Sequence, residues 1–456
     1  MSIISGPVPW YGVQELPLKN RLHWCPHCNV PLLGKSCACR RAGETIRCHP
    51  PFEVRPALRH DREVIAGLLR DRFGVEQVPR ILLLCKSGGL DRVDRVIAAG
   101  REIGHLRFDP VSRTYQLDPS LDALSVILPS VSRGIVDIPS TGGHVVGKRI
   151  PVETDLCPGP VIVRHGDRWG VGQLREGAVR VKELGHITPR EIPDPSYQDA
   201  VACNHRHLKN MERHAVRMVR RYMRDGRRMN VAVSGGKDST AVREIARRAG
   251  VTESYFVDTG MEFPETLAHI DECGVDTILS GRDFWRLFER RGAPAKDDRW
   301  CCEDLKIAPI REWIGRTGSC RTVQGIRWYE SFSRSRIPES MNNPLVPGQE
   351  TIHPIRNWRA LEVFFYLWWR RLPYNPLYEM GFERVGCWMC PAMLEAEFDI
   401  VREIHPHRAQ RWVDALVARG SMPEAYYRAG LWRWRRHPPK AQECARFLGL
   451  HLPNGK

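Results

Sequence analysis

The first clear hydrophobic pattern along the chain is helical. Between residues 61 and 73, apolar side chains recur at the spacing of one helix face, at Val64, Ile65, Leu68 and Leu69. Residues 80–85 then form a short apolar run that is typical of a buried strand. We therefore predict a small α/β module over residues 51–134.

The pattern changes to short β-rich runs between residues 135 and 192. Residues 143–152 and 160–164 are rich in β-branched side chains, and glycines and turn residues separate the runs. This pattern predicts a small β-barrel over residues 135–192. Its length and position resemble a PUA domain, a module common in RNA-modifying enzymes, and other small barrels share the same pattern.

A domain boundary follows at residues 192–195, where two prolines in four residues oppose both helix and sheet. Beyond it, one face of an amphipathic helix is traced by apolar side chains at Leu208, Met211, Ala215, Met218 and Tyr222. Residues 229–233 and 255–257 are typical of buried strands, and each precedes a turn and a helical stretch. This order predicts an α/β domain over residues 196–400, followed by a basic helical tail over residues 401–456.

Length and composition narrow the class of protein. A chain of 456 residues predicts two to four domains, at roughly 100 to 200 residues each. Hydrophobic residues make up 42% and charged residues 27%, which excludes a fibrous or wholly disordered chain. The longest apolar runs are too short to cross a bilayer, and the N-terminus lacks a basic stretch followed by an apolar one. We therefore expect a cytoplasmic protein with no membrane partner.

The charge is strongly basic and unevenly placed. The formal net charge is +16, and residues 201–230 and 401–456 carry +7 each. Such concentration favours a surface that faces phosphates, and hence a nucleic acid partner. The alternative is a pair of solvated helices.

Fifteen cysteines in a chain without an export signal favour metal ligands and thiols over disulfides. The first group comprises two close pairs: Cys25, Cys28, Cys37 and Cys39. Two pairs on short turns suit a tetrahedral zinc ion, which replaces a hydrophobic core. We predict a zinc ribbon over residues 1–50, in which Cys48 or His49 could substitute for one ligand.

A glycine-rich loop follows the predicted strand at residues 229–233. Its residues are Ser234, Gly235, Gly236, Lys237, Asp238 and Ser239. In a turn between a strand and a helix, glycines let backbone N–H groups approach phosphate oxygens, and the helix N-terminus adds partial positive charge. The string lacks the glycine spacing of the Walker pattern. The loop therefore predicts a phosphate cradle of another kind.

This loop resembles the pyrophosphate loop of the adenine nucleotide alpha-hydrolase superfamily, which includes N-type ATP pyrophosphatases and the adenylylsulfate and phosphoadenylylsulfate (PAPS) reductases. The strings Asp-Thr-Gly at residues 258–260 and Phe-Pro-Glu-Thr at residues 263–266 resemble the reductase branch. The resemblance implies a doubly wound, mostly parallel sheet with ligands at its carboxyl edge. It also implies nucleotide-binding roles for Asp258, Thr259, Gly260, Glu265 and Thr266.

A third match lies further along the chain. Gly-Ile-Arg at residues 325–327, with Glu330, Ser331 and Arg334, is similar to the family pattern. Planar guanidinium groups donate two parallel hydrogen bonds to an anion. The resemblance therefore predicts that Arg327 and Arg334 clamp a sulfate or phosphate, with surface salt bridging as the alternative.

A second cysteine group lies inside this domain, at Cys301, Cys302, Cys387 and Cys390. Adjacent thiolates crowd one zinc ion, whereas a cubane cluster offers separate irons to neighbouring sulfurs. The pattern resembles the 4Fe-4S site of adenylylsulfate reductases and related sulfur-inserting enzymes, and zinc is the alternative. By the same resemblance, Lys306 lies near the cluster and the substrate.

The C-terminal region departs from the family. Assimilatory reductases carry a Glu-Cys-Gly tail whose cysteine attacks the substrate sulfur. Here Glu443 and Cys444 are followed by alanine. Cys444 is therefore a candidate nucleophile, although packing against a helix is the favoured interpretation.

Three functions remain open. The first is an adenine-nucleotide-dependent sulfur transfer to RNA (a tRNA or rRNA), using ATP with Mg²⁺, the cluster, and a sulfur donor or reductant protein that the sequence does not identify; DNA is also open as the acceptor. The second is a stand-alone adenylylsulfate or PAPS reductase that forms sulfite. The third is a non-catalytic protein that binds a nucleotide and RNA.

Overall fold

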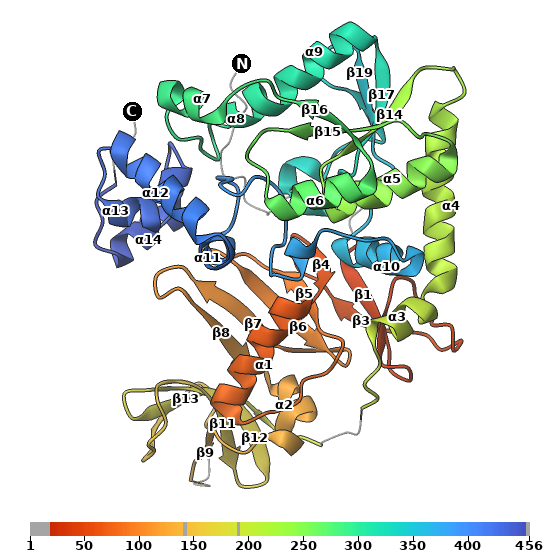
Figure 1. Cartoon of the computed structure of the whole chain (residues 1–456). Coiled ribbons are helices and arrows are strands. Elements are labelled where there is room, and N and C mark those ends of the chain that lie inside the picture. Colours follow the sequence, from red (N-terminus) through yellow and green to blue (C-terminus); the bar gives the residue numbers. More distant parts are fainter. Residues whose placement is uncertain (1–18, 140–143, 189–191, 453–456) are drawn as a thin grey trace. The chain divides into compact units, whose positions relative to one another are not determined.

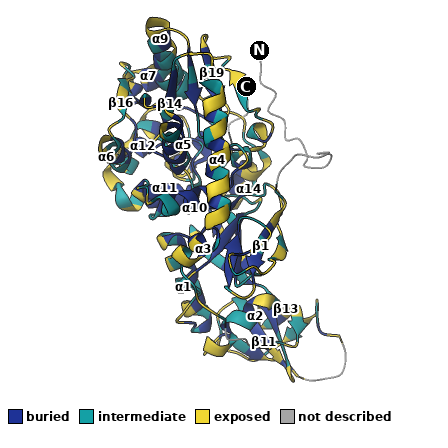
Figure 2. Ribbon diagram, turned by 90° about the vertical axis from the view of Figure 1, so that its right-hand side faces the viewer, coloured by how far each residue is buried: buried dark blue, intermediate teal, exposed yellow. Residues whose placement is uncertain are grey.

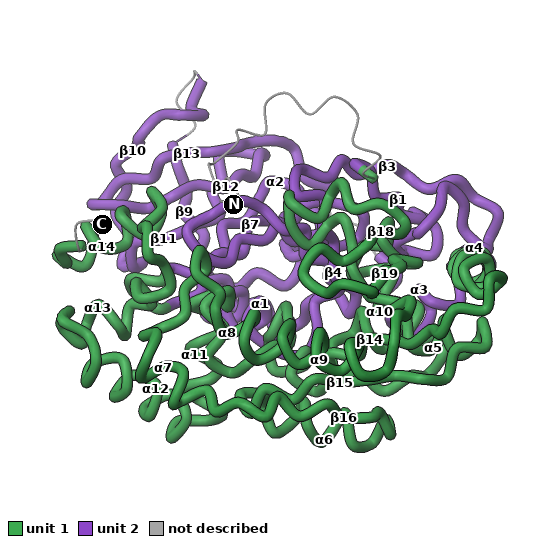
Figure 3. Tube along the Cα trace, turned by 90° about the horizontal axis from the view of Figure 1, so that it is seen from above, with its two compact units in different colours: residues 1–19, 110–113, 208–456 green, residues 20–109, 114–207 purple. Residues whose placement is uncertain are grey.

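The computed structural model describes residues 19–139, 144–188 and 192–452. Parts of the predicted zinc ribbon (residues 1–18), β-barrel (140–143 and 189–191) and basic tail (453–456) lie outside the described residues. The chain divides into two compact units, drawn in different colours in Figure 3. Unit 1 comprises residues 1–19, 110–113 and 208–456, and unit 2 comprises residues 20–109 and 114–207. No described helix has the length and apolar character to span a membrane.

Unit 2 contains three sheets (Figure 1). The first joins β1 (Arg21–Cys25) to β2 (Val30–Leu32) and β3 (Glu44–Arg47), all antiparallel. The second is a curled antiparallel half-barrel made of β4 (Val54–Pro56), β5 (Leu83–Lys86), β6 (Val93–Ala98), β7 (Arg101–Asp109) and β8 (Thr114–Pro119). Helices α1 (Arg59–Phe73) and α2 (Leu121–Ile127) bury Ile65, Leu69 and Leu124 in one core with this sheet. The helix and strand predicted over residues 61–85 are thus confirmed.

The β-rich segment that begins at residue 135 forms the third sheet. Its strands lie in the order β10-β13-β12-β11-β9. Its strands are β9 (Ile135–Asp137), β10 (Arg149–Pro151), β11 (Gly159–His165), β12 (Arg168–Arg175) and β13 (Ala178–Gly185). Only β9 and β11 pair in parallel. Among the described residues β9 and β10 are its two edges, so the sheet stays open. Unit 2 ends with α3 (Tyr197–Cys203) and the first residues of α4 (His205–Tyr222).

Unit 1 is built on a six-stranded sheet in the order β16-β15-β14-β17-β19-β18. The strands are β14 (Met229–Val233), β15 (Ser254–Asp258), β16 (Asp276–Leu279), β17 (Cys320–Val323), β18 (Ser340–Asn342) and β19 (Gln349–Ile352). All pairs are parallel except β18 with β19. This confirms the predicted mostly parallel α/β sheet. In chain order the parallel strands run 3-2-1-4-5, so the strand order reverses between β14 and β17, where open α/β sheets bind ligands.

Helices cover both faces of this sheet in Figure 1. Helices α5 (Lys237–Ala249) and α6 (Pro264–Cys273) lie on one side, and α9 (Ala308–Thr317) lies on the other. Helix α5 begins at Lys237, because Gly236 acts as its N-cap. The strand β14 is almost fully buried, as expected for a central parallel strand.

The helix α4 buries only part of the face that its apolar spacing predicts. The buried side chains are Leu208, Glu212, Ala215 and Val219, whereas Met211 and Met218 are only partly buried. The difference arises at Glu212, whose carboxylate accepts hydrogen bonds from Tyr366 Oη (3.0 Å) and Arg370 Nε (2.6 Å). Both partners belong to α10 (Ala360–Arg370). A paired carboxylate can be buried, so the helix turns toward Glu212.

The helices after residue 394 share one core with earlier segments. They are α11 (Glu395–Ile404), α12 (Pro406–Arg419), α13 (Glu424–Arg428) and α14 (Pro439–Phe447). Their aromatic side chains, such as Trp412 and Trp432, pack with α7 (Phe284–Arg291) and with Trp300 of α8 (Trp300–Cys302). The predicted helical character of this region is confirmed.

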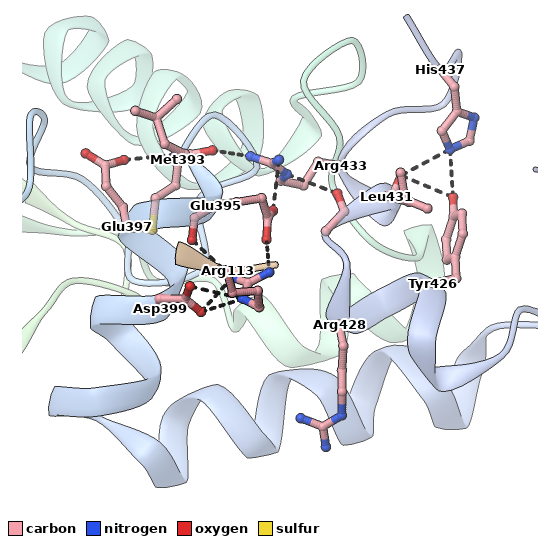
Figure 4. Close-up of polar contacts among 12 residues, drawn as sticks. Arg113, Met393, Glu395, Glu397, Asp399, Tyr426, Arg428, Leu431, Arg433 and His437 are labelled. Carbon is pink, nitrogen blue, oxygen red and sulfur yellow. Dashed lines mark hydrogen bonds and ion pairs between the residues drawn. The ribbon is translucent and has the colours of Figure 1, made fainter. Parts of the chain in front are cut away.

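A buried polar network lies inside this helical region. Figure 4 shows Glu395 between two arginines, Arg113 and Arg433. The Glu395 and Arg433 side chains are 3% and 4% exposed. Arg433 also donates to the carbonyl of Met393. These basic groups therefore hold the helices together rather than face solvent.

We predict that Glu212→Gln lowers the free energy of unfolding of unit 1 by about 2 kcal/mol, because Arg370 and Tyr366 lose a charged acceptor. Urea unfolding followed by tryptophan fluorescence measures the change. The matched control is Glu424→Gln, which breaks an exposed pair with Arg428 and should change stability by less than about 1 kcal/mol. Equal losses in the two variants would contradict this role of Glu212.

Candidate nucleotide and metal sites

The loop between β14 and α5 is shaped by glycine. Gly235 has φ +71°, and a Cβ atom there would lie 2.7 Å from Cγ2 of Thr266, so a larger residue meets both strain and a clash. Within the described residues, the N–H groups of Gly235 and Gly236 have no acceptor. The loop therefore offers two backbone donors beside a helix N-terminus, the arrangement that binds anions.

Ser239 and Tyr378 brace this loop from within. Ser239 Oγ donates to the Gly236 carbonyl (2.7 Å) and accepts from Ser234 N–H (3.1 Å). The Lys237 N–H donates to Tyr378 Oη at 3.0 Å. These bonds fix the loop in one conformation before any ligand arrives.

Three buried charges lie where the strand order reverses. Asp238 Oδ2 is 2.9 Å from Lys237 Nζ, and its Oδ1 is 2.6 Å from Arg327 Nε. Gly325 permits this contact, since a Cβ there would lie 2.7 Å from the Asp238 carbonyl. Burial alone would raise the pKa of Asp238, but Arg327 and Lys237 lower it below its usual range. The loops after β14 and β17 are thus tied together.

Of the two arginines predicted to clamp an anion, only Arg327 lies inside this network in the described part of the chain. The Arg327 side chain is 3% exposed and faces Asp238, and its Nη1 also donates to the Trp358 carbonyl (3.2 Å). Arg334 pairs with Glu330 at 2.6 Å and is 36% exposed. Ser331 Oγ lies 3.1 Å from Ser333 Oγ. Of the two arginines, Arg334 is the one that solvent reaches.

The segment after β15 carries an acid that the sequence analysis missed. Thr259 donates from both N–H (3.0 Å) and Oγ1 (2.8 Å) to Glu262, which is 5% exposed. Asp258 Oδ1 accepts from the Gly260 N–H at 2.7 Å. Burial raises the pKa of Glu262, although Lys306 and Thr259 oppose the shift. In the sequence, the feature that could have indicated Glu262 is its position two residues after the Asp-Thr-Gly string.

Glu265 and Thr266, also predicted to bind nucleotide, take part in packing on α6. Glu265 is 3.1 Å from His405 Nε2. Thr266 Oγ1 accepts from Asn375 at 2.9 Å, and the Thr266 side chain is buried against Gly235. Of the two, Thr266 packs against the glycine loop, whereas Glu265 contacts His405.

The second cysteine group gathers beside the end of β15. Cys301 and Cys302 lie on α8. The backbone of Cys387 pairs with that of Glu262 in an isolated antiparallel β-bridge. Hydrogen bonding with Cys301 lowers the pKa of Cys302 to about 5, whereas burial raises the pKa of Cys387 to about 12. The pKa of Cys301 is raised, with Cys302, Cys387 and Cys390 among the causes. These thiols therefore lie in one neighbourhood, although in the described part of the chain they do not form a compact group like that of the first four cysteines.

Two cations accompany these thiols. Arg299 Nη2 donates to Cys302 Sγ at 3.1 Å. A π-helical turn, Glu303–Ile307, follows α8 and carries Lys306, whose Nζ is 3.7 Å from Glu262. The negative charge of Cys387 raises the pKa of Lys306. Such turns often occur at functional sites, and here the turn directs a cation between the cysteines and Glu262.

The first cysteine group is more compact. In Cys25, Cys28, Cys37 and Cys39 all four sulfurs lie within 4.8 Å of one another, with Cys25–Cys39 at 3.6 Å and Cys28–Cys37 at 3.8 Å. A tetrahedral zinc with bonds of about 2.3 Å spaces its sulfurs by about 3.8 Å. These cysteines can therefore hold one zinc ion. Among the described residues no other group is so compact, Cys48 and His49 included.

The C-terminal cysteine lies in the apolar core. Cys444 is 7% exposed on α14 and belongs to the same hydrophobic cluster as Trp412 and Trp432. This placement agrees with the packing interpretation that the sequence analysis favoured.

Comparison with known proteins places the chain in a family. Uncharacterized protein MJ0066 of Methanocaldococcus jannaschii is 30% identical over 464 residues, covering 91% of this chain and 97% of that protein. Uncharacterized protein MJ0973 of the same organism is 29% identical over 411 residues, covering 86% and 97%. The chain belongs to the family of these two proteins. Residues 228–393, which lie in unit 1 and include its six-stranded sheet, the glycine loop and the second cysteine group, match the phosphoadenosine phosphosulfate reductase domain.

Other matches cover less of the chain. Adenosine 5'-phosphosulfate reductase of Geobacillus kaustophilus is 30% identical over 149 residues, 31% of this chain and 62% of that protein. The crystal structure of phosphoadenylyl-sulfate reductase from Candida auris aligns with a TM-score of 0.33 and 16% identity, over 40% of this chain and 95% of that one.

We predict that Gly235→Ala weakens ATP binding at least about tenfold, because the added Cβ displaces Thr266 and the loop. Gly226→Ala is the matched control: it has the same φ of +71° but open space around the added atom. Isothermal titration calorimetry compares the variants. An unchanged affinity in Gly235→Ala would contradict a role for this loop in binding ATP.

We also predict that Cys28→Ser lowers the bound zinc well below one ion per chain and exposes unit 2 to proteolysis, since the metal stabilises the β1-β2-β3 sheet. Elemental analysis by mass spectrometry measures the metal. Cys157→Ser, which changes an exposed cysteine outside the group, should keep the wild-type zinc content. Full zinc in Cys28→Ser would exclude this cysteine as a ligand.

Proposed function

We propose that the chain is an adenine-nucleotide-dependent sulfur-transfer enzyme that acts on RNA. The observation that carries the nucleotide part is the reversal point between β14 and β17. There, the N–H groups of Gly235 and Gly236, which have no acceptor within the described residues, lie at the N-terminus of α5. An anion such as the pyrophosphate of ATP would accept hydrogen bonds from these donors and be favoured by the helix N-terminus.

The chemistry that we propose begins with adenylation. A carbonyl oxygen of an RNA base attacks the α-phosphorus of ATP, pyrophosphate leaves, and the oxygen becomes part of a good leaving group. A sulfur nucleophile then replaces AMP at the same carbon. In this scheme residues 234–239 hold the pyrophosphate, Asp258 and Thr259 face the nucleoside, and Arg334 contacts the anion from the solvent side.

The second cysteine group would hold a 4Fe-4S cluster. Four cysteine thiols in one neighbourhood match the donor set of such a cluster in number and type. The buried indole N–H groups of Trp300 and Trp388, each next to a cysteine in the sequence, have no acceptor in the described part of the chain. When bound, the cluster would supply redox chemistry or an iron that carries sulfur. Lys306 and Arg299 would stabilise the negative charge of the thiolates.

RNA is proposed as the acceptor because the chain is strongly basic and because unit 2 carries a small β-sheet unit over residues 135–185, the region that resembles a PUA domain. A tRNA or rRNA is the expected class. The zinc-binding segment would serve as a folding or docking element.

The second candidate is a reductase that forms sulfite from adenylylsulfate or PAPS. The relatives named as adenosine 5'-phosphosulfate reductases favour it. The buried position of Cys444 weighs against it, because the attacking thiol of such a reaction needs access to the substrate sulfur.

The test uses protein purified without oxygen. We predict about four irons and four sulfides per chain, release of pyrophosphate from ATP, and thiolated nucleosides in copurified RNA after digestion. Cys387→Ser should lose most of the iron, because it removes a buried ligand, whereas Cys273→Ser should keep it. Sulfite formed from adenylylsulfate without pyrophosphate release would favour the reductase. Zinc in place of iron would refute the cluster.

A further inference from the structure

The two basic blocks of the chain have different environments in the structure. In the C-terminal block, Arg402, Arg428, Arg433 and Arg435 each pair with an acidic side chain of unit 1. Arg408 and Arg411 lie over the rings of Trp388 and Trp285. These six side chains are therefore already engaged in contacts within unit 1, as Figure 4 illustrates for Arg433.

The block on α4 is different. Its outer cation row, which we define as Lys209, Arg213, Arg217 and Arg220, is exposed along its whole length. The spacings of four, four and three residues put these side chains on one helix face, and Figure 2 shows exposed residues along the outer side of α4. At 1.5 Å per residue the row is about 16 Å long.

The outer cation row has no acidic partner among the described residues. Arg220 donates to the neutral carbonyl of Arg248, and the other three make no ion pair. The single acid of α4, Glu212, points into the core and pairs with Arg370. Elsewhere in unit 1, arginines on helices pair with an acid one turn away, as in Arg248–Glu244 and Arg428–Glu424.

This arrangement destabilises the isolated helix. Lys209, Arg213 and Arg217 repel one another at i,i+4 spacing, and no carboxylate screens them. A row of mobile cations at intervals of about 5 to 6 Å matches the charge of a phosphodiester chain, which releases counterions when it is neutralised. An acidic protein surface is less suited, because its carboxylates do not recur along a regular backbone.

We propose that the outer cation row of α4 binds the phosphate backbone of the nucleic acid substrate. The inference rests on the proposed function, in which RNA is the acceptor, and adds the surface that holds it. Helix α4 leads directly through residues 223–228 into β14 and its phosphate loop, so a strand bound along α4 is held on the same unit as the nucleotide site.

The test compares two variants that both lower the formal net charge from +16 to +12. The row variant is K209Q/R213Q/R217Q/R220Q. The control variant is R247Q/R311Q/R428Q/R435Q, which removes exposed arginines that already have acidic partners. Circular dichroism and thermal unfolding verify that both variants fold.

Binding is measured by fluorescence anisotropy with a labelled single-stranded RNA of about 20 nucleotides and the matching DNA, from 50 to 200 mM salt. The row variant should lose about 2.8 from the slope of log K against log salt, at about 0.7 for each of four cations. Between 50 and 200 mM salt, the affinity of the wild-type protein should therefore fall about 50-fold more than the affinity of the row variant. The control variant should keep the wild-type slope.

The two oligonucleotides identify the source of the phosphates. Tighter binding of RNA than of DNA indicates that the 2′-hydroxyl is read as well, and the loss in the row variant on either probe supports the proposal. Equal losses in the row and control variants would overturn it, and so would an equal loss on polyglutamate, which would indicate an acidic protein partner. If the wild-type protein binds neither oligonucleotide, the RNA part of the proposed function falls too, whereas ATP binding and iron content are unaffected.

Discussion

The structure of unit 1 depends on one buried electrostatic contact, the carboxylate of Asp238 between Lys237 and Arg327. Burying charges is unfavourable unless they are paired, and here two cations share one acid. Because Arg327 follows β17 and Asp238 follows β14, this contact joins the two loops at the point where the strand order reverses. The N–H groups of Gly235 and Gly236 lie beside this contact, and this is where the proposed anionic ligand would bind.

A second set of contacts joins the end of β15 to the cysteines. Thr259 bonds to Glu262, and Glu262 lies next to both Lys306 and Cys387. Two buried side chains, Thr259 and Glu262, thus connect the cysteines with the segment that follows β15. Under the proposed function, this arrangement would let a cluster and a nucleotide act on the same substrate.

Local signals were enough to predict much of this. The strand at residues 229–233, the glycine loop and the compact cysteine group all depend on neighbours within a few residues, and the structure confirms these elements. Contacts between distant residues were not predictable. The prediction for the buried face of α4 was only partly right, because Glu212 pairs with Arg370, which lies 158 residues later in the chain. Arg327 could be recognised as an anion-binding type of residue, but not as the partner of Asp238. Glu262 was missed because a buried acid has no pattern of its own until Thr259 and Lys306 surround it.

The central claim is that an adenine nucleotide binds where β14 and β17 diverge. Hydrogen exchange with and without ATP, read by mass spectrometry on anaerobic full-length protein, tests it directly. The account predicts slower exchange in the peptides that span residues 233–240 and 324–331, with little change in the sheet β10-β13-β12-β11-β9. Slower exchange elsewhere, with these two peptides unchanged, would contradict it.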